Sequence, residues 1–108
     1  MYKAHLSWPM AVTVDGFDWD DANRAKCGKH GVPSEEIEAM FAVEVGIAPD
    51  LEHSGDETRF IAVGRTRAGR PMFVAFTLRI RDGLRLIRPV SARYMHAKEI
   101  REYEASHS

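Results

Sequence analysis

The sequence predicts an α+β domain in which two early helices pack on a mainly antiparallel sheet of about four to five strands, with a further helix at the C-terminal end. A chain of 108 residues suits one compact domain with a modest core. Helix signals lie within residues 20–41, and apolar residues alternate with polar residues in most of the segment from 43 to 93. Because helices and strands occupy separate segments, the α+β class is favoured over an alternating α/β fold.

The first 19 residues predict only short extended segments. Alternation of apolar residues over 10–14 predicts a strand, which Gly16 breaks, and a second extended piece at 17–19 leads into the first helix. Residues 1–9 have no periodicity. We therefore expect residues 1–9 to be loosely ordered.

Capping residues place the two early helices. Asp20 suits the N-cap of a helix over about 20–27, whose apolar face of Ala22 and Ala25 is weak. Ser34 is the expected cap of the next helix, which follows Pro33. The core face of this second helix consists of Ile37, Met40 and Phe41.

The rest of the chain predicts strands and a last helix. Asp82-Gly83 is the signature of a type I′ hairpin turn. Pro89 cannot donate a hydrogen bond to a strand ladder, so the last strand has an edge or a bulge there, and a bulge would re-aim the side chains that follow. The expected strands cover residues 43–49, 59–65, 71–79 and 84–93, and the helix covers residues 96–105.

The formal net charge of −1 hides an asymmetry along the chain. Residues 1–58 carry 4 Lys or Arg and 12 Asp or Glu, whereas residues 59–101 carry 11 Lys or Arg and 2 Asp or Glu. A basic sheet beside an acidic helical region is a candidate nucleic-acid face. The alternative is that the two halves pair with each other across the surface, and the sequence leaves both readings open.

The cysteine content and the hydropathy limit the cellular compartments and cofactors that we expect for this protein. A single cysteine, Cys27, excludes an intrachain disulfide and fits a reducing cytoplasm. The sequence has neither a membrane-spanning apolar run nor the apolar block of a signal peptide. His53 lies in the acidic loop 50–57, but without a helical histidine pair or a cysteine partner the loop is read as solvated. We expect a cytoplasmic protein with no membrane contact, metal or cofactor.

The densest chemistry lies in residues 85–103, where arginines, a histidine and a tyrosine surround a strand-to-helix corner. Arginine suits a phosphate-rich partner because its planar guanidinium binds two phosphate oxygens and stays charged. Metal-free RNA cleavage further needs a base for the 2′-OH proton and an acid for the leaving oxygen, and histidine titrates in the right range. The alternative for each arginine is a solvated position on the sheet.

Several segments, taken in their order and spacing, resemble the BrnT family of bacterial toxins. None is specific alone, but KHGV, the GRT strand and SAR before a Glu- and Tyr-bearing helix are specific in combination. The resemblance covers about residues 17–104, so residues 1–16 lie outside it and are expected to form an N-terminal extension. The segments are FDWD (17–20), KHGV (29–32), EEIEAMF (35–41), PDLEHS (49–54), ETRFIAVGRT (57–66), GRPMFVAFTLR (69–79) and IRPVSARYMHAKEIREYE (87–104).

The resemblance implies a compact toxin domain over residues 17–105 with a fold similar to RelE-type ribonuclease toxins. It implies RNA cleavage without metal or cofactor, and a small, DNA-binding, BrnA-like antitoxin partner. Leu78 stands where family members often carry an acidic residue, and the last helix is less basic than theirs. The polar residues that match the family pattern are Lys29, His30, Arg65, Arg79, Arg88 and Arg93.

We therefore predict a metal-independent endoribonuclease toxin. A non-catalytic module that binds nucleic acid or an acidic protein is the alternative, followed by an unrelated small enzyme or structural protein; a homodimer is left open. The candidate catalytic residues are Arg79, Arg88, Arg93, His96 and His30, and the candidate RNA-binding residues are Lys29, Arg65, Tyr94 and Lys98.

Overall fold

A computed structural model of the chain describes residues 14–43, 45–53 and 55–106. The strand expected over residues 10–14 falls, except for Val14, outside the described residues, as does most of the N-terminal extension. Gly16, expected to break that strand, instead belongs to a short strand of its own. The helices and strands are β1 (Gly16–Phe17), α1 (Asp21–Gly28), α2 (Ser34–Phe41), β2 (Gly46–Pro49), β3 (Phe60–Arg65), β4 (Pro71–Arg81), β5 (Leu84–Tyr94) and α3 (Ala97–Ser106).

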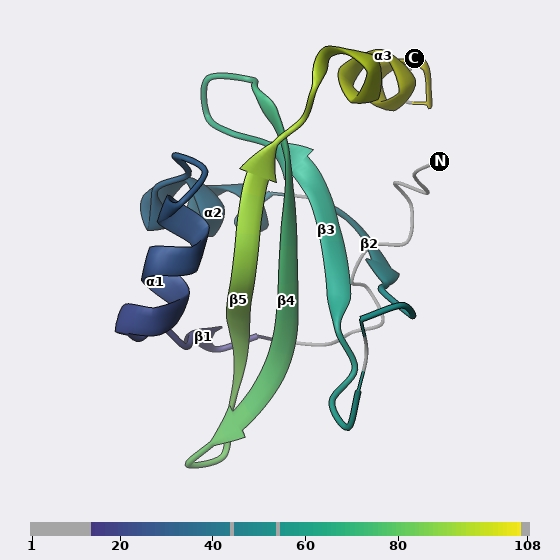
Figure 1. Cartoon of the computed structure of the whole chain (residues 1–108). Coiled ribbons are helices and arrows are strands. Elements are labelled where there is room, and N and C mark those ends of the chain that lie inside the picture. Colours follow the sequence, from purple (N-terminus) through teal and green to yellow (C-terminus); the bar gives the residue numbers. More distant parts are fainter. Residues whose placement is uncertain (1–13, 44, 54, 107–108) are drawn as a thin grey trace.

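The five strands form one mixed sheet in the order β1-β5-β4-β3-β2 (Figure 1). β1 runs parallel to β5, and the other neighbours are antiparallel. The long β4–β5 hairpin extends at one end of the sheet, and α3 lies at the opposite end (Figure 1). Three helices and a mainly antiparallel sheet confirm the expected α+β class.

Helix α1 begins with a reciprocal capping box. The Asp20 carboxylate accepts from the backbone N–H of Asn23 at 2.9 Å, and the Asn23 side chain accepts from the backbone N–H of Asp20 at 2.7 Å. The expected apolar face was wrong: Ala22 and Ala25 are exposed, and Asn23 and Cys27 are buried. An asparagine is tolerated inside because its amide finds backbone acceptors there.

Helix α2 begins differently from the prediction. Pro33 holds the N-cap position, and no side chain caps the helix. Ser34 is the first helical residue, and its hydroxyl accepts a hydrogen bond from Arg24 instead of capping. The expected core face is confirmed, since Ile37 and Met40 are fully buried and Phe41 packs against the same cluster.

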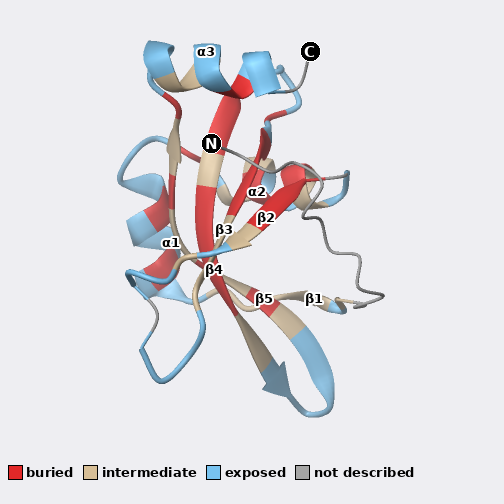
Figure 2. Ribbon diagram, turned by 90° about the vertical axis from the view of Figure 1, so that its right-hand side faces the viewer, coloured by how far each residue is buried: buried red, intermediate tan, exposed pale blue. Residues whose placement is uncertain are grey.

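Different helices pack on the two faces of the sheet. Phe60, Ala62, Val74 and Phe76 pack with buried residues of α1 and α2 in the main core. Their alternate neighbours point to the opposite face. Among the described residues, the end of this face near α3 is covered by a small cluster that includes Ile61 and Phe73 of the sheet and Ile100 and Tyr103 of α3. We call this second side the open face; Figure 2 shows the buried residues concentrated in the middle of the strands.

The hairpin between β4 and β5 has the predicted turn. Asp82 and Gly83 both adopt positive φ angles, 52° and 78°. This is what a type I′ turn requires of its two central residues. The turn fixes the register of the hairpin from its tip, beginning with Arg81 opposite Leu84.

A β-bulge interrupts this register beside Pro89, where the sequence predicted an edge or a bulge. Phe76 pairs with Pro89 and Ala75 pairs with Ser91, so Val90 is an extra residue on β5. Residues an odd number apart on a regular strand point to opposite faces. Because of the bulge, Arg88 lies opposite Thr77 while Ser91 lies opposite Ala75, and both face the open side of the sheet.

Asn23 fixes the bulge to helix α1. Its side-chain amide donates to the carbonyl of Pro89 at 2.9 Å, in a buried position, and to the carbonyl of Asp18 at 2.9 Å. We predict that Asn23→Ala lowers the free energy of unfolding by about 1–3 kcal/mol, because it leaves a buried carbonyl without its donor. Urea unfolding at equilibrium measures this loss.

Lys26→Ala is the control for Asn23→Ala, because Lys26 is exposed on the same helix. It should change stability by less than about 0.5 kcal/mol. Equal effects of the two substitutions would contradict the structural role given to Asn23.

Candidate functional site

A pocket of about 330 Å³ opens where the β2–β3 loop meets β4 and β5. We call it the arginine pocket because three guanidinium groups line it. It combines these cations with a histidine, two carboxylates and a threonine hydroxyl. Its lining residues are His53, Gly55, Asp56, Glu57, Arg59, Thr77, Arg79, Arg88 and Val90.

Strand register explains why these side chains meet. Thr77 and Arg79 are two residues apart on β4 and therefore share a face. Arg88 is paired with Thr77 across the β4–β5 ladder. Arg59 immediately precedes β3, and its carbonyl accepts from the backbone N–H of Asp50, which closes the loop beneath the pocket.

Carboxylates fix two of the arginines. Glu57 receives hydrogen bonds from Nε and Nη2 of Arg79 at 2.8 and 3.3 Å, and this pairing raises the pKa of Arg79 above its usual value. Arg88 donates from Nη2 to Asp20 at 2.8 Å, and its Nη1 lies 3.6 Å from Asp18. The pocket thus holds its cations in set positions before any ligand enters.

The reciprocal effect is seen on Asp20. The backbone N–H of Asn23 and then the Arg88 guanidinium hold the pKa of Asp20 below its usual value. Asp20 therefore caps α1 and orients Arg88 at the same time, which links the helix start to the arginine pocket.

His53 contributes a titratable ring to the pocket. Its Nδ1 lies 3.0 and 3.1 Å from the two carboxylate oxygens of Asp50. A carboxylate at one ring nitrogen fixes the orientation of an imidazole and leaves Nε2 for a ligand. Sequence reasoning assigned His53 to a solvated loop and did not single out Glu57 or Arg59.

The signal for these missed residues was present in the spacing. Glu57 and Arg59 are two residues apart at the entrance to a strand, as Thr77 and Arg79 are within the next strand. Adjacent antiparallel strands with this spacing bring such residues together on one face. The register that aligned them was not available from the sequence.

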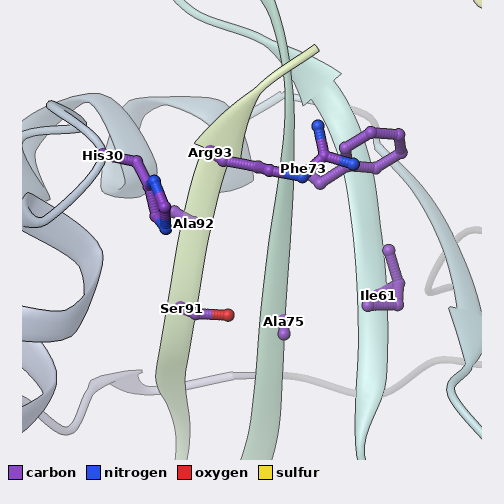
Figure 3. A pocket seen from close by; sticks show the side chains of 7 residues that line it. All are labelled: His30, Ile61, Phe73, Ala75, Ser91, Ala92 and Arg93. Carbon is purple, nitrogen blue, oxygen red and sulfur yellow. The ribbon is translucent and has the colours of Figure 1, made fainter. Parts of the chain in front are cut away.

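A second pocket of about 330 Å³ lies farther along the same sheet (Figure 3). We call it the sheet hollow. Ser91 and Arg93 extend from β5 toward β4, whereas the His30 ring lies beside Ala92 on the other side of β5 (Figure 3). The lining residues are His30, Ile61, Phe73, Ala75, Ser91, Ala92 and Arg93.

Arg93 is held by a fork-to-fork ion pair. Its Nη1 and Nη2 donate to Glu99 of α3 at 2.9 and 2.8 Å, and its guanidinium lies 4.7 Å from the ring centroid of Phe73. Arg93 and, secondarily, the backbone N–H of His96 lower the pKa of Glu99 to about 2. This pair fastens the start of α3 to the sheet.

The remaining candidate residues lie outside the two linings. Lys29, His96 and Lys98 are exposed. Arg65 contacts α3, 3.5 Å from Glu104 and over the ring of Tyr103. Tyr94 points toward the helices: its hydroxyl donates to the carbonyl of Gly31 at 3.5 Å, and Arg70 covers its ring. The structure therefore brings Arg79 and Arg88 together in the arginine pocket, but not the whole predicted set. Arg93 and His30 both line the sheet hollow, on opposite sides of β5.

The chemistry of the arginine pocket is that of an anion site with a proton donor or acceptor. Three guanidinium groups can bind oxygens of a phosphate and stabilise added negative charge. Within the described part of the chain, no group of three His, Cys, Asp or Glu side chains is arranged as a metal site. None of the described helices is long and apolar enough to cross a bilayer.

The BrnT family model, described as the ribonuclease toxin BrnT of type II toxin–antitoxin systems, matches residues 19–99. The chain therefore belongs to the BrnT family, for which RNA is the target and an antitoxin protein the partner. A search of curated proteins gives no match.

The Arg93–Glu99 pair predicts a pH dependence of stability. Because the folded-state pKa of Glu99 is depressed, its contribution is present above about pH 4.5 and is lost as the pH falls toward 2. We expect Glu99→Gln to cost about 1 kcal/mol at pH 7, given that the pair is partly exposed. The difference in unfolding free energy between the two proteins should shrink over that pH range in urea titrations.

Glu102→Gln is the matched control, because Glu102 is an exposed carboxylate on the same helix. It should leave the pH dependence of stability unchanged. A Glu99→Gln protein as stable as the wild type at pH 7 would show that the pair does not fasten α3.

Proposed function

We propose that this BrnT family member is a metal-independent endoribonuclease toxin whose arginine pocket holds the scissile phosphate of RNA. The observation that carries the proposal is the meeting of Arg59, Arg79 and Arg88 with His53 in one pocket. Arginines at a phosphate supply charge stabilisation in the transition state without a metal ion. The pocket also offers a titratable group, which a purely phosphate-binding surface does not need.

The reaction proceeds by attack of a ribose 2′-oxygen on the adjacent phosphorus. The new 2′-O–P bond forms while the P–O5′ bond breaks, and the products are a 2′,3′-cyclic phosphate and a 5′-hydroxyl. A base takes the proton of the 2′-OH, and an acid gives a proton to the leaving 5′-oxygen. His53, oriented by Asp50, is placed to act in one of these two proton transfers.

The other candidate residues take supporting roles in this proposal. Arg93 and His30 line the neighbouring sheet hollow, so they contact RNA beyond the scissile phosphate. Lys29, Arg65 and Lys98 provide positive charge around the face, which attracts RNA without sequence preference. His96 remains a candidate proton donor only if RNA binding moves the corner before α3. Tyr94 faces the helices, and we propose a structural role for it.

We further propose that the partner is a small, DNA-binding, BrnA-like antitoxin that neutralises the toxin by covering the open face. Arginines engaged by antitoxin carboxylates are not available to RNA phosphate. The toxin acts in the cytoplasm, where its RNA target is.

We predict that Arg79→Gln lowers kcat for RNA cleavage roughly 10²-fold, because one phosphate-stabilising cation is removed. A mixed-sequence single-stranded RNA serves as substrate, and mass spectrometry identifies fragments ending in 2′,3′-cyclic phosphate. Cleavage by the wild type should be unchanged in EDTA.

Arg67→Gln is the matched control for Arg79→Gln. Arg67 makes a similar exposed ion pair, with Glu36 at 2.7 Å, but lies on the turn between β3 and β4. Both substitutions should leave the protein folded, because exposed ion pairs contribute little to stability. Salt-dependent RNA binding without any cleavage by the wild type would favour the non-catalytic binding module instead.

A second prediction distinguishes the roles of His53 and His96 in proton transfer. His53→Gln should lower kcat roughly 10²-fold, since it removes a proton-transfer group beside the arginines. His96→Gln, a change at an exposed histidine outside the arginine pocket, should leave kcat within about twofold of the wild type. Initial rates at saturating RNA measure both, and the reverse result would move the proton-transfer role to the corner before α3.

A further inference from the structure

The sheet hollow is continuous with the arginine pocket along β4 and β5. Ala75 and Ser91 form one cross-strand pair in the hollow, and Thr77 and Arg88 form a pair that lines the arginine pocket. These two rows are separated along β4 by two residues, roughly 7 Å. A phosphate in one pocket and a base in the other can therefore belong to the same or to adjacent nucleotides.

Small side chains make the hollow. Ala75 lies at its centre, between Ser91 on β5 and Ile61 on β3, in one row across three strands. In the next row toward α3, Phe73 is paired with Arg93. The Phe73 ring lies beside the Arg93 side chain, farther along the sheet than Ala75 (Figure 3). A flat apolar floor thus has an aromatic ring and a guanidinium at one side and a hydroxyl at another.

The hydrogen bonds of Arg93 indicate which kind of ligand group the hollow can bind. Glu99 occupies both terminal nitrogens of the guanidinium, so its hydrogen-bonding edge is engaged, while the group still lines the hollow. The guanidinium lies over the Phe73 ring, 4.7 Å from its centroid, so the two groups form one stacked pair beside the hollow. Nucleobases stack on aromatic rings and on arginine guanidinium planes. The hollow is therefore suited to a planar ring more than to a second phosphate.

We propose that the sheet hollow is a nucleobase site, which binds one base of single-stranded RNA next to the scissile phosphate. Phe73, Ala75 and Arg93 hold the ring, and the Ser91 hydroxyl hydrogen-bonds its edge and contributes base preference. This proposal rests on the proposed function in one respect, that RNA phosphate occupies the arginine pocket. A protein segment in the hollow is the other outcome that the experiment distinguishes.

The test measures binding without cleavage. Fluorescence anisotropy gives the Kd of fluorescein-labelled 2′-O-methyl tetranucleotides, which lack the attacking hydroxyl, and of an abasic tetranucleotide with the same number of phosphates. We expect the wild type to bind at least one base-bearing tetranucleotide roughly tenfold or more tightly than the abasic one.

Ala75→Leu fills the centre of the hollow, and it should abolish the advantage of base-bearing over abasic tetranucleotides. Ala68→Leu, on the exposed turn between β3 and β4, should keep that advantage. Because Ala75 lies within β4, circular dichroism checks the fold, and Ser91→Ala serves as a milder variant. Ser91→Ala should change the order of preference among the four bases while leaving the Kd of the abasic tetranucleotide unchanged.

The outcomes separate this inference from the proposed function. Equal wild-type affinity for abasic and base-bearing tetranucleotides, with RNA still cleaved, would overturn the nucleobase site alone and leave the hollow to a protein partner. An advantage of bases that survives in Ala75→Leu would place the base elsewhere. Loss of abasic binding in Arg79→Gln, with the base advantage retained, would support both pockets.

Discussion

The bulge at Pro89–Ser91 is the constraint on which the candidate site depends. Without it, Arg88 and Arg93, five residues apart on one strand, would point to opposite faces of the sheet. With Val90 as the extra residue, both face the open side. The buried hydrogen bond from Asn23 to the Pro89 carbonyl fixes the bulge to α1. This polar contact therefore links the helix to the strand that carries the site.

Carboxylates from distant parts of the chain hold the arginines of this face. Asp20, at the start of α1, pairs with Arg88; Glu57, in the loop before β3, pairs with Arg79. The acidic first half and the basic second half thus meet across the surface, and arginines still line a pocket. In the proposed phosphate site, RNA would have to compete with these carboxylates, but the paired guanidinium groups are already ordered, which would reduce the entropy lost on binding.

The two pockets differ in how their arginines are used. In the arginine pocket, Arg79 and Arg88 share space with a histidine and a hydroxyl, a composition suited to phosphate chemistry. In the sheet hollow, Glu99 accepts hydrogen bonds from both terminal nitrogens of Arg93, and the Arg93 side chain lines the hollow. In the two proposals, arginine therefore serves charge stabilisation in one pocket and base stacking in the other.

The sequence by itself determined the α+β class, the helix and strand order and the hairpin turn, because these depend on local periodicity and on the backbone limits of glycine. It also marked Pro89 as the place of an edge or a bulge, and the strand register decided for the bulge. Its motif combination also indicated the BrnT family. Only the tertiary structure decided that Asn23 is buried, that His53 joins Arg79, and that Tyr94 faces the helices. Those outcomes depend on strand register and on partners far away in the chain, which local patterns do not encode.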